Sequence, residues 1–223
     1  MRIIGIVGSP RKEKGNTGRL MLEVLKSAQQ QGATFETVAL PGGTVLPCLA
    51  CDTCHKKGFC PQRDEFDDIM GRIMASDGIV LASPNYIFNV SAQLKAFMDR
   101  CCGVIHCLGF EGRYGASVVT SGGGDEAPIA EMMNHFMITT GVTPVGSVWA
   151  TMGSFEGDEF PDEIVVRARA LGRKLVDDWR KKNVPADIAE RKVRFAERMR
   201  QLMLYRKDEW PYEYQYWQKK NRL

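Results

Sequence analysis

The feature that most constrains the fold of this chain is the alternation of short apolar segments with amphipathic ones. The apolar segments lie at residues 2–7, 34–40, 78–82, 115–120 and 142–150. Their length and continuous apolar character are typical of buried strands, and the segments between them repeat apolar residues every three to four positions, as helices do. Strands that alternate with helices predict an α/β fold with a parallel sheet covered on both faces. Short connections and right-handed crossovers favour the doubly wound, five-stranded order 2-1-3-4-5.

Turn and capping residues set the expected ends of the helices. Gly32 is expected to end a helix over residues 17–31, and Asp64 and Ser91 are expected to cap the helices that follow them. The predicted apolar face of the helix after Asp64 consists of Phe66, Ile69, Met70, Ile73 and Met74.

Two parts of the chain are expected to differ in role. Residues 1–182 suffice for the α/β domain and include a cysteine-rich loop at 47–61, while residues 183–223 form a C-terminal extension. The extension contains an amphipathic helix over residues 188–205 and a tail, residues 210–217, with five aromatic side chains in eight positions. Such a tail needs burial, so we expect an arm that contacts a neighbouring subunit in a homodimer or homotetramer, with packing on its own domain as the alternative.

Charge and hydropathy exclude several classes of protein. The formal net charge of +3 is too small to indicate nucleic-acid binding. No stretch approaches the roughly 18 apolar residues of a membrane span, and the apolar N-terminus ends in a turn after Val7, too soon for a signal peptide. We therefore expect a cytoplasmic protein without nucleic-acid or membrane partners. The basic residues of segment 167–207 are expected to be solvated helix faces, with a patch for a dinucleotide phosphate or an acidic partner as the alternative.

The loop after the first predicted strand carries candidate phosphate ligands. It contains the short polar side chains of Ser9, Asn16 and Thr17 and the charged guanidinium of Arg11, directly before a predicted helix. A helix N-terminus binds phosphate through free N–H groups and its partial positive charge. The loop contains neither the P-loop motif nor the dinucleotide-binding glycine pattern. An ordinary polar turn with Asn16 or Thr17 as a helix cap stays open on this reasoning alone.

Three loops together resemble those of the NADPH-dependent FMN reductase family, which has the flavodoxin-like fold. The motifs are Gly-Ser-Pro-Arg with Asn-Thr at residues 8–17, the segment 83–100 with its S-A-x-L-K-x-F-x-D-R pattern, and Thr-Ser-Gly-Gly-Gly at 120–124. The resemblance covers residues 1–182 and implies bound FMN. The implied FMN-binding residues are Ser9, Arg11, Asn16, Thr17, Pro84, Asn85, Tyr86, Ile87, Phe88, Ser121, Gly122 and Gly123.

Four of the seven cysteines lie within thirteen residues, in the pattern C-x2-C-x2-C-x5-C-P. They are Cys48, Cys51, Cys54 and Cys60. Compact thiolate spacing of this kind favours a 4Fe–4S cluster, while zinc or a metal-free loop stays open. The run also resembles the cysteine motif of iron–sulfur flavoproteins, which belong to the same FMN-binding superfamily. His55 is expected to be a solvated neighbour and not a ligand.

Three further cysteines, Cys101, Cys102 and Cys107, lie close to His106. We expect them to be buried or half-buried free thiols. A redox role or a second metal site that includes His106 is the alternative.

The function implied by these resemblances is electron transfer by FMN and a 4Fe–4S cluster. The expected donor is ferredoxin or NAD(P)H and the expected acceptor is a small molecule, and no side chain is required as a catalytic acid or base. A cluster-free NAD(P)H-dependent FMN or quinone reductase is one alternative. A non-enzymatic flavodoxin-like redox carrier or sensor is another.

Overall fold

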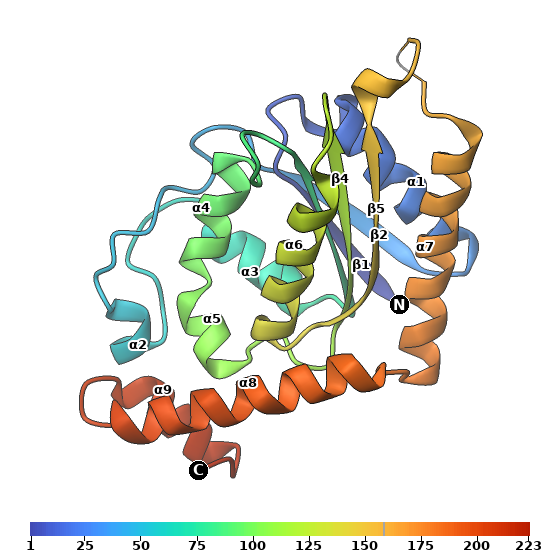
Figure 1. Cartoon of the computed structure of the whole chain (residues 1–223). Coiled ribbons are helices and arrows are strands. Elements are labelled where there is room, and N and C mark those ends of the chain that lie inside the picture. Colours follow the sequence, from blue (N-terminus) through green and yellow to red (C-terminus); the bar gives the residue numbers. More distant parts are fainter. Residues whose placement is uncertain (158) are drawn as a thin grey trace.

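In the computed structural model, which describes residues 1–157 and 159–223, five parallel strands form one sheet (Figure 1). The strands are β1 (Arg2–Val7), β2 (Thr34–Ala39), β3 (Gly78–Pro84), β4 (Tyr114–Ser121) and β5 (Thr143–Thr151). Their order in the sheet is β2-β1-β3-β4-β5. The predicted doubly wound, flavodoxin-like arrangement is therefore confirmed.

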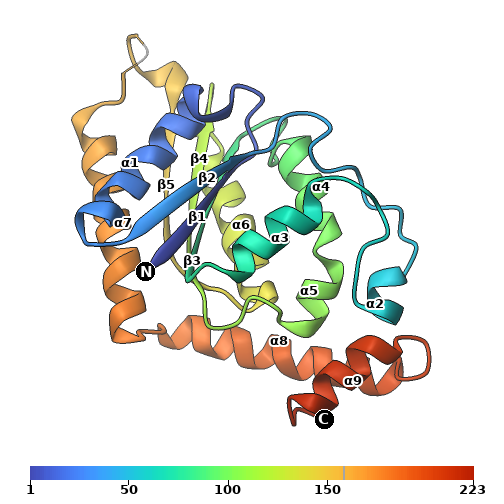
Figure 2. The same cartoon turned by 180° about the vertical axis from the view of Figure 1, so that it is seen from behind.

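Helices cover both faces of this sheet (Figures 1 and 2). One face is covered by α1 (Asn16–Gln30) and α7 (Asp162–Lys181), which contact each other along their length. The other face is covered by α3 (Phe66–Met74), α4 (Ala92–Arg100), α5 (Cys102–Cys107) and α6 (Glu126–Thr140). A short helix, α2 (Thr53–Lys57), lies within the cysteine-rich loop.

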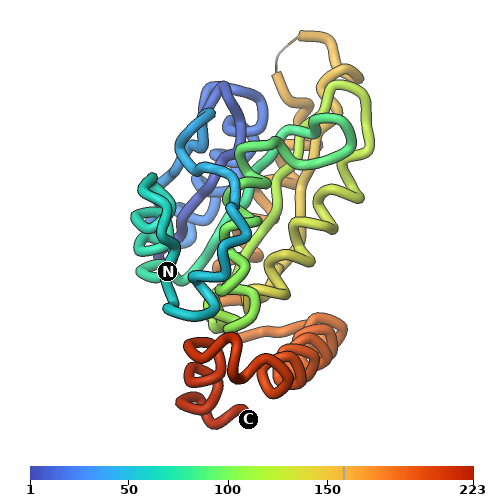
Figure 3. Tube along the Cα trace, turned by 90° about the vertical axis from the view of Figure 1, so that its left-hand side faces the viewer, coloured from blue at the N-terminus to red at the C-terminus, as the bar shows by residue number. Residues whose placement is uncertain are grey.

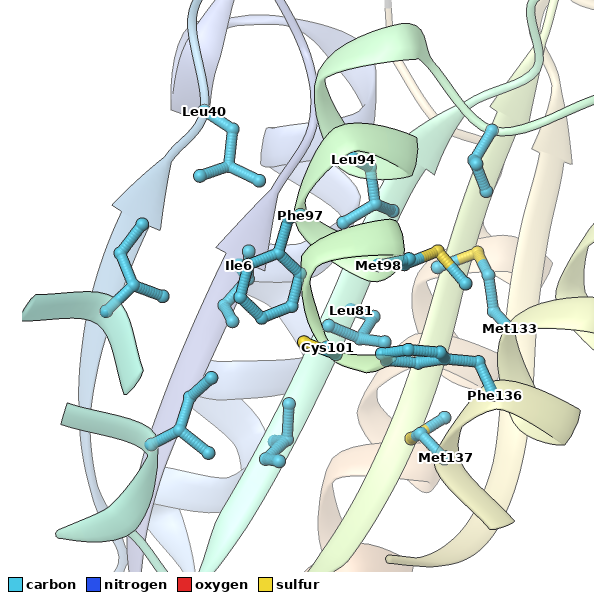
Figure 4. Packing of buried hydrophobic residues seen from close by; sticks show 14 of the residues in the cluster. Ile6, Leu40, Leu81, Leu94, Phe97, Met98, Cys101, Met133, Phe136 and Met137 are labelled. Carbon is cyan, nitrogen blue, oxygen red and sulfur yellow. The ribbon is translucent and has the colours of Figure 1, made fainter. Parts of the chain in front are cut away.

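The core lies in two layers because successive side chains of a strand point to opposite faces. Ile4 and Ile6 of β1 pack into the layer below α3 to α6, while Ile3 and Val7 pack below α1 and α7. Figure 4 shows Phe97, Met133 and other side chains of α4 and α6 meeting Ile6 and Leu81 of the sheet.

Ser91 caps α4 as predicted, whereas the N-cap of α3 is Glu65, one residue after the predicted Asp64. The Asp64 carboxylate accepts the Phe66 N–H at 3.0 Å, and the Ser91 hydroxyl accepts the Leu94 N–H at 3.3 Å. One residue of the predicted apolar face differs: Met74 closes α3 and is 53% exposed. Met74 instead lines a mainly apolar cavity.

The C-terminal extension packs against the end of the domain at which β1 begins (Figures 1 and 3). It consists of α8 (Ala186–Tyr205) and α9 (Pro211–Lys219). Trp217 is 2% exposed, packs with Leu108, Met199 and Met203, and donates its indole N–H to the His106 carbonyl at 2.9 Å. Trp217 is thus buried against its own chain, whereas Tyr212 of the same tail is 42% exposed. The expected contact of the tail with a neighbouring subunit stays a prediction. Among the described helices, none has the length and hydropathy needed to cross a membrane.

Candidate functional site

A cavity of about 290 Å³ lies at the carboxyl ends of β1, β3 and β4. Ligands of open α/β sheets bind at this edge, where the strand order reverses. The lining residues are Ser9, Arg11, Gly15, Asn16, Thr17, Pro84, Asn85, Tyr86, Thr120, Ser121, Gly122 and Met152. The fold therefore brings nine of the twelve residues predicted for FMN into one cavity, while Ile87, Phe88 and Gly123 lie outside its lining.

The first loop of the cavity places the N-terminus of α1 at its edge. The Ser9 hydroxyl accepts the Arg11 N–H at 3.2 Å, and a 3-10 turn, Lys12–Lys14, leads back to Asn16, where α1 begins. This turn packs tightly on the helix, because a Cβ atom at Gly18 would lie 2.4 Å from the Glu13 Cα atom. Free N–H groups of the first helical turn therefore lie beside the polar side chains that suit a phosphate.

The second loop holds Asn85 rigidly and leaves an apolar pair exposed. The Asn85 side-chain amide donates to the Gly124 carbonyl at 2.9 Å, whereas its buried Oδ1 atom has no hydrogen-bond partner. Ile87 and Phe88 form the tip of a turn with φ angles of 49° and 60°, and are 91% and 75% exposed. A left-handed conformation is unfavourable for a β-branched residue, and exposed apolar tips of this kind mark binding surfaces.

The third loop is held by Glu126, a buried residue that the sequence reasoning missed. The Glu126 carboxylate accepts hydrogen bonds from the Ser121 hydroxyl and, at 2.6 Å, from the Thr151 hydroxyl. Burial raises the pKa of this carboxyl, but the two hydroxyl donors outweigh burial and lower the pKa below its usual range. Its position in the first turn of α6, just after a glycine-rich loop, is the signal that could have identified it.

These features fit FMN. The helix N-terminus with Ser9, Arg11, Asn16 and Thr17 offers donors for a phosphate. The orphaned Asn85 Oδ1 offers an acceptor inside the cavity, where a buried polar atom needs a partner.

The cysteine-rich loop contains donors of the right chemistry for an iron–sulfur cluster. Cys48 and Cys51 are exposed, and Cys54 and Cys60 are half-buried. Hydrogen bonding with Thr53 lowers the pKa of the Cys51 thiol, which favours the thiolate that metals bind. Cys54 and Cys60 line a second cavity of about 350 Å³, which is otherwise mainly apolar. Among the described residues, one group has ligand atoms close enough together to share a single metal ion, and it includes none of these four cysteines.

That set contains His55 from the cysteine-rich loop and Cys102 and His106 from α5. His55 is buried, which corrects the expectation of a solvated neighbour. Its Nδ1–H donates to Glu213 at 2.6 Å, and His106 Nδ1–H donates to the other Glu213 oxygen at 2.9 Å. The two imidazole rings stack with centroids 4.8 Å apart, and both stack on Trp210.

The ionisable groups of this set shift one another's pKa values. Hydrogen bonds from His106 and His55 lower the pKa of the Cys102 thiol to about 6. Burial alone would lower the pKa of His106, but Cys102 and Glu213 raise it to about 9. For Glu213 the directions are reversed: burial raises the pKa of the carboxyl, but the two histidines outweigh burial and lower the pKa below its usual range. Cys101 and Cys107 are buried free thiols as expected, and burial raises the pKa of both.

Comparison with known proteins gives concordant results. The model of the NADPH-dependent FMN reductase family matches residues 1–157. An iron–sulfur flavoprotein of Archaeoglobus fulgidus is 36% identical over 183 residues, which are 82% of either chain. An iron–sulfur flavoprotein of Methanocaldococcus jannaschii is 35% identical over 187 residues, which are 79% of this chain and 96% of the relative.

Among solved structures, RosB with a bound flavin-phosphate intermediate matches with a TM-score of 0.67 at 12% identity, over 81% of this chain and 79% of that one. The NADH:FMN oxidoreductase EmoB matches with a TM-score of 0.58 at 16% identity, over 83% and 90%. At these identities, the structural matches show the fold alone.

Proposed function

This chain belongs to the NADPH-dependent FMN reductase family, and on that basis we propose that it is an iron–sulfur flavoprotein that transfers electrons between FMN and a 4Fe–4S cluster. When bound, FMN supplies one- and two-electron exchange and the cluster supplies single-electron transfer. The observation that carries the proposal is the convergence of three predicted loops on one cavity at the carboxyl ends of the strands.

The residues of the first loop would hold the FMN phosphate. Ser9, Asn16 and Thr17 supply hydrogen-bond donors and Arg11 supplies charge at the N-terminus of α1. Pro84, Asn85, Tyr86, Ile87 and Phe88 would position the flavin ring, together with Ser121, Gly122 and Gly123. Ile87 and Phe88 are exposed in the chain alone and would become covered by the ring and exclude water from it.

Cys48, Cys51, Cys54 and Cys60 would hold the cluster. Their soft thiolate donors suit iron, and their compact C-x2-C-x2-C-x5-C spacing suits a cluster held by one short loop. The names of the relatives from Archaeoglobus fulgidus and Methanocaldococcus jannaschii support the same assignment. No acid or base is assigned, because electron exchange at a flavin does not require one from the protein.

A cluster-free NAD(P)H-dependent FMN or quinone reductase is the second candidate. It is favoured by the exposure of Cys48 and Cys51, which leaves half of the proposed ligand set outside the protein interior. The donor discriminates between the candidates: rapid bleaching of the flavin by NADPH favours this one, and reduction only by a ferredoxin-like donor favours the first.

The decisive experiment measures iron, acid-labile sulfide and FMN per chain after purification without oxygen. We expect about four iron and four sulfide per FMN. Iron and sulfide should be lost together in the variant Cys48→Ser/Cys51→Ser. FMN without iron would support the cluster-free reductase instead. Protein that binds no FMN would contradict both candidates.

A further inference from the structure

A second group of chemically active side chains lies outside the flavin cavity, where α2, α5 and α9 meet. It consists of His55 from α2, Cys102 and His106 from α5, and Glu213 from α9. Neither the flavin loops nor the proposed cluster ligands include any of them. The Glu213 side chain is fully buried, and those of His55 and His106 are only 7% and 13% exposed. Buried groups of this polarity need a structural or functional reason.

The hydrogen bonds of the group orient both imidazoles in the same way. Each Nδ1–H donates to one oxygen of the Glu213 carboxylate, at 2.6 Å for His55 and 2.9 Å for His106. This leaves the Nε2 lone pair of each ring available. A carboxylate that fixes histidine through the far ring nitrogen is the usual outer shell of a histidine metal ligand.

The available donors converge on one position. Cys102 Sγ lies 3.9 Å from His106 Nε2, and the ligand atoms of His55, Cys102 and His106 all lie within 4.8 Å of one another. Ligand atoms about 2.1 and 2.3 Å from one tetrahedral ion are about 3.6 Å apart. The Cys102–His106 pair therefore already has nearly this spacing, and the third donor needs to move by no more than about 1.5 Å.

We propose that His55, Cys102 and His106 form a mononuclear binding site for a divalent transition metal, with zinc as the preferred ion and Glu213 as the carboxylate that orients the two histidines. Two imidazoles and one thiolate are donors that zinc accepts in tetrahedral sites. Three protein ligands leave a fourth position open. The half-exposed Asp52 has a carboxylate oxygen 3.9 Å from His55 Nε2.

The site also connects distant parts of the chain. Glu213 is 158 residues from His55 and 107 from His106, and Trp210 stacks on both imidazoles at 4.5 and 5.0 Å. A metal held here would bind the cysteine-rich loop, α5 and the C-terminal helix to one another. Metal binding would then contribute directly to the stability of this end of the molecule.

The test is zinc binding by the full-length protein, purified without oxygen, in competition with a chelator of known affinity. We expect about one zinc per chain in the wild type. Cys102→Ser should weaken zinc binding at least about 100-fold, and Glu213→Gln, which keeps the shape of the side chain, should weaken it about 10- to 100-fold. Cys107→Ala is the matched control on the same helix, because Cys107 is buried and lines the other cavity; its zinc affinity should equal that of the wild type.

Cobalt(II) separates this site from the cysteine-rich loop. In the Cys48→Ser/Cys51→Ser background, added Co²⁺ should give tetrahedral ligand-field bands and a thiolate charge-transfer band, and both should disappear when Cys102→Ser is added. Wild-type protein that binds no zinc would overturn the proposal. So would zinc that is retained by Cys102→Ser and by His106→Gln, or zinc that is lost only with Cys48 and Cys51. Each readout is independent of whether FMN and a cluster bind.

Discussion

Thr17 and Thr120 contact each other through their hydroxyl oxygens, which are 2.6 Å apart, and so connect the first turn of α1 to the end of β4. β3 lies between β1 and β4 in the sheet, so this contact spans the carboxyl end of β3. Both side chains are buried and both line the candidate flavin cavity. The hydrogen bond therefore sets the spacing between the phosphate loop and the third loop of the site.

This contact predicts a non-additive pair of variants. Thr120→Val leaves the buried Thr17 hydroxyl without its partner, so we expect the free energy of unfolding to fall by about 1–3 kcal/mol. Thr17→Val should cost a similar amount and also weaken FMN binding, because Thr17 is a proposed phosphate ligand. The double variant should be destabilised by less than the sum of the single variants, since no hydroxyl is then left unpaired. Denaturant unfolding and FMN titration measure both effects, and strict additivity in stability would contradict the contact.

Gly18 predicts a second effect on the same loop. A Cβ atom at this position would lie 2.4 Å from the Glu13 Cα atom and 2.5 Å from the Lys12 carbonyl oxygen. Gly18→Ala should therefore displace the 3-10 turn, lower stability by about 1–3 kcal/mol and weaken FMN binding. Gly71→Ala in α3 is the matched control: its Cβ would meet nothing within 4 Å, so the higher helix propensity of Ala should stabilise the protein by about 0.5–1 kcal/mol. Equal behaviour of the two variants would show that the turn does not pack on α1 as described.

Local patterns were sufficient to predict the sheet and the flavin cavity. The strand β1 has the predicted bounds, Ser91 caps α4 as predicted, and the N-cap of α3 lies one residue after the predicted Asp64. The reason is that strand and helix periodicity and capping depend on neighbours in sequence. Because parallel strands all end at one edge, the three loops that follow β1, β3 and β4 had to meet there.

Contacts between distant segments could not be predicted in this way. His55 was expected to be solvated, and it is buried because α9 supplies Glu213 and Trp210 from the other end of the chain. Trp217 of the aromatic tail packs on Leu108, Met199 and Met203 of its own chain, which is the alternative to the expected contact with a neighbouring subunit. Nothing in the periodicity of either segment identifies its partner. The helix α2 has five residues, too few for a periodic signal.

The ion pair between Asp64 and Arg100 predicts a pH dependence of stability. The guanidinium donates to Asp64 at 2.8 Å, and the two side chains are 5% and 1% exposed. Burial raises the pKa of Asp64, but the hydrogen bonds from Arg100 and from the Leu46 and Phe66 N–H groups lower it below its value of 3.8. Because the folded state has the lower pKa, the ion pair stabilises the protein fully above about pH 4. The stabilisation is lost as the pH falls through the folded-state pKa.

Asp64→Asn tests this dependence. It leaves the buried Arg100 charge uncompensated, so we expect a loss of about 3–5 kcal/mol at pH 7. The variant should also lack the acid-dependent decrease that Asp64 contributes in the wild type. The matched control is Asp68→Asn: Asp68 is 72% exposed and lies 3.8 Å from Arg72, so its effect should stay below about 0.5 kcal/mol. Denaturant unfolding between pH 3 and pH 7 measures both, and parallel pH profiles for Asp64→Asn and the wild type would refute the prediction.

The packing of Trp217 predicts that stability at one end of the molecule can be lowered without a change in FMN affinity at the other end. Its side chain is 2% exposed, packs on Met199 and Met203, and donates to the His106 carbonyl at 2.9 Å. Trp217→Ala removes this packing and leaves a cavity, so we expect a loss of about 3–5 kcal/mol. α9 lies at the end of the sheet at which β1 begins (Figure 1), whereas the flavin cavity is lined by residues at the carboxyl ends of the strands. The affinity for FMN should therefore not change while the protein stays folded. Tyr205→Ala is the control, because Tyr205 is 78% exposed and its removal should have little effect on stability. Because Trp217 is buried on its own chain, the mass measured by sedimentation should be the same for Trp217→Ala and the wild type. A smaller assembly in the variant, at unchanged stability, would instead place Trp217 in a contact between subunits.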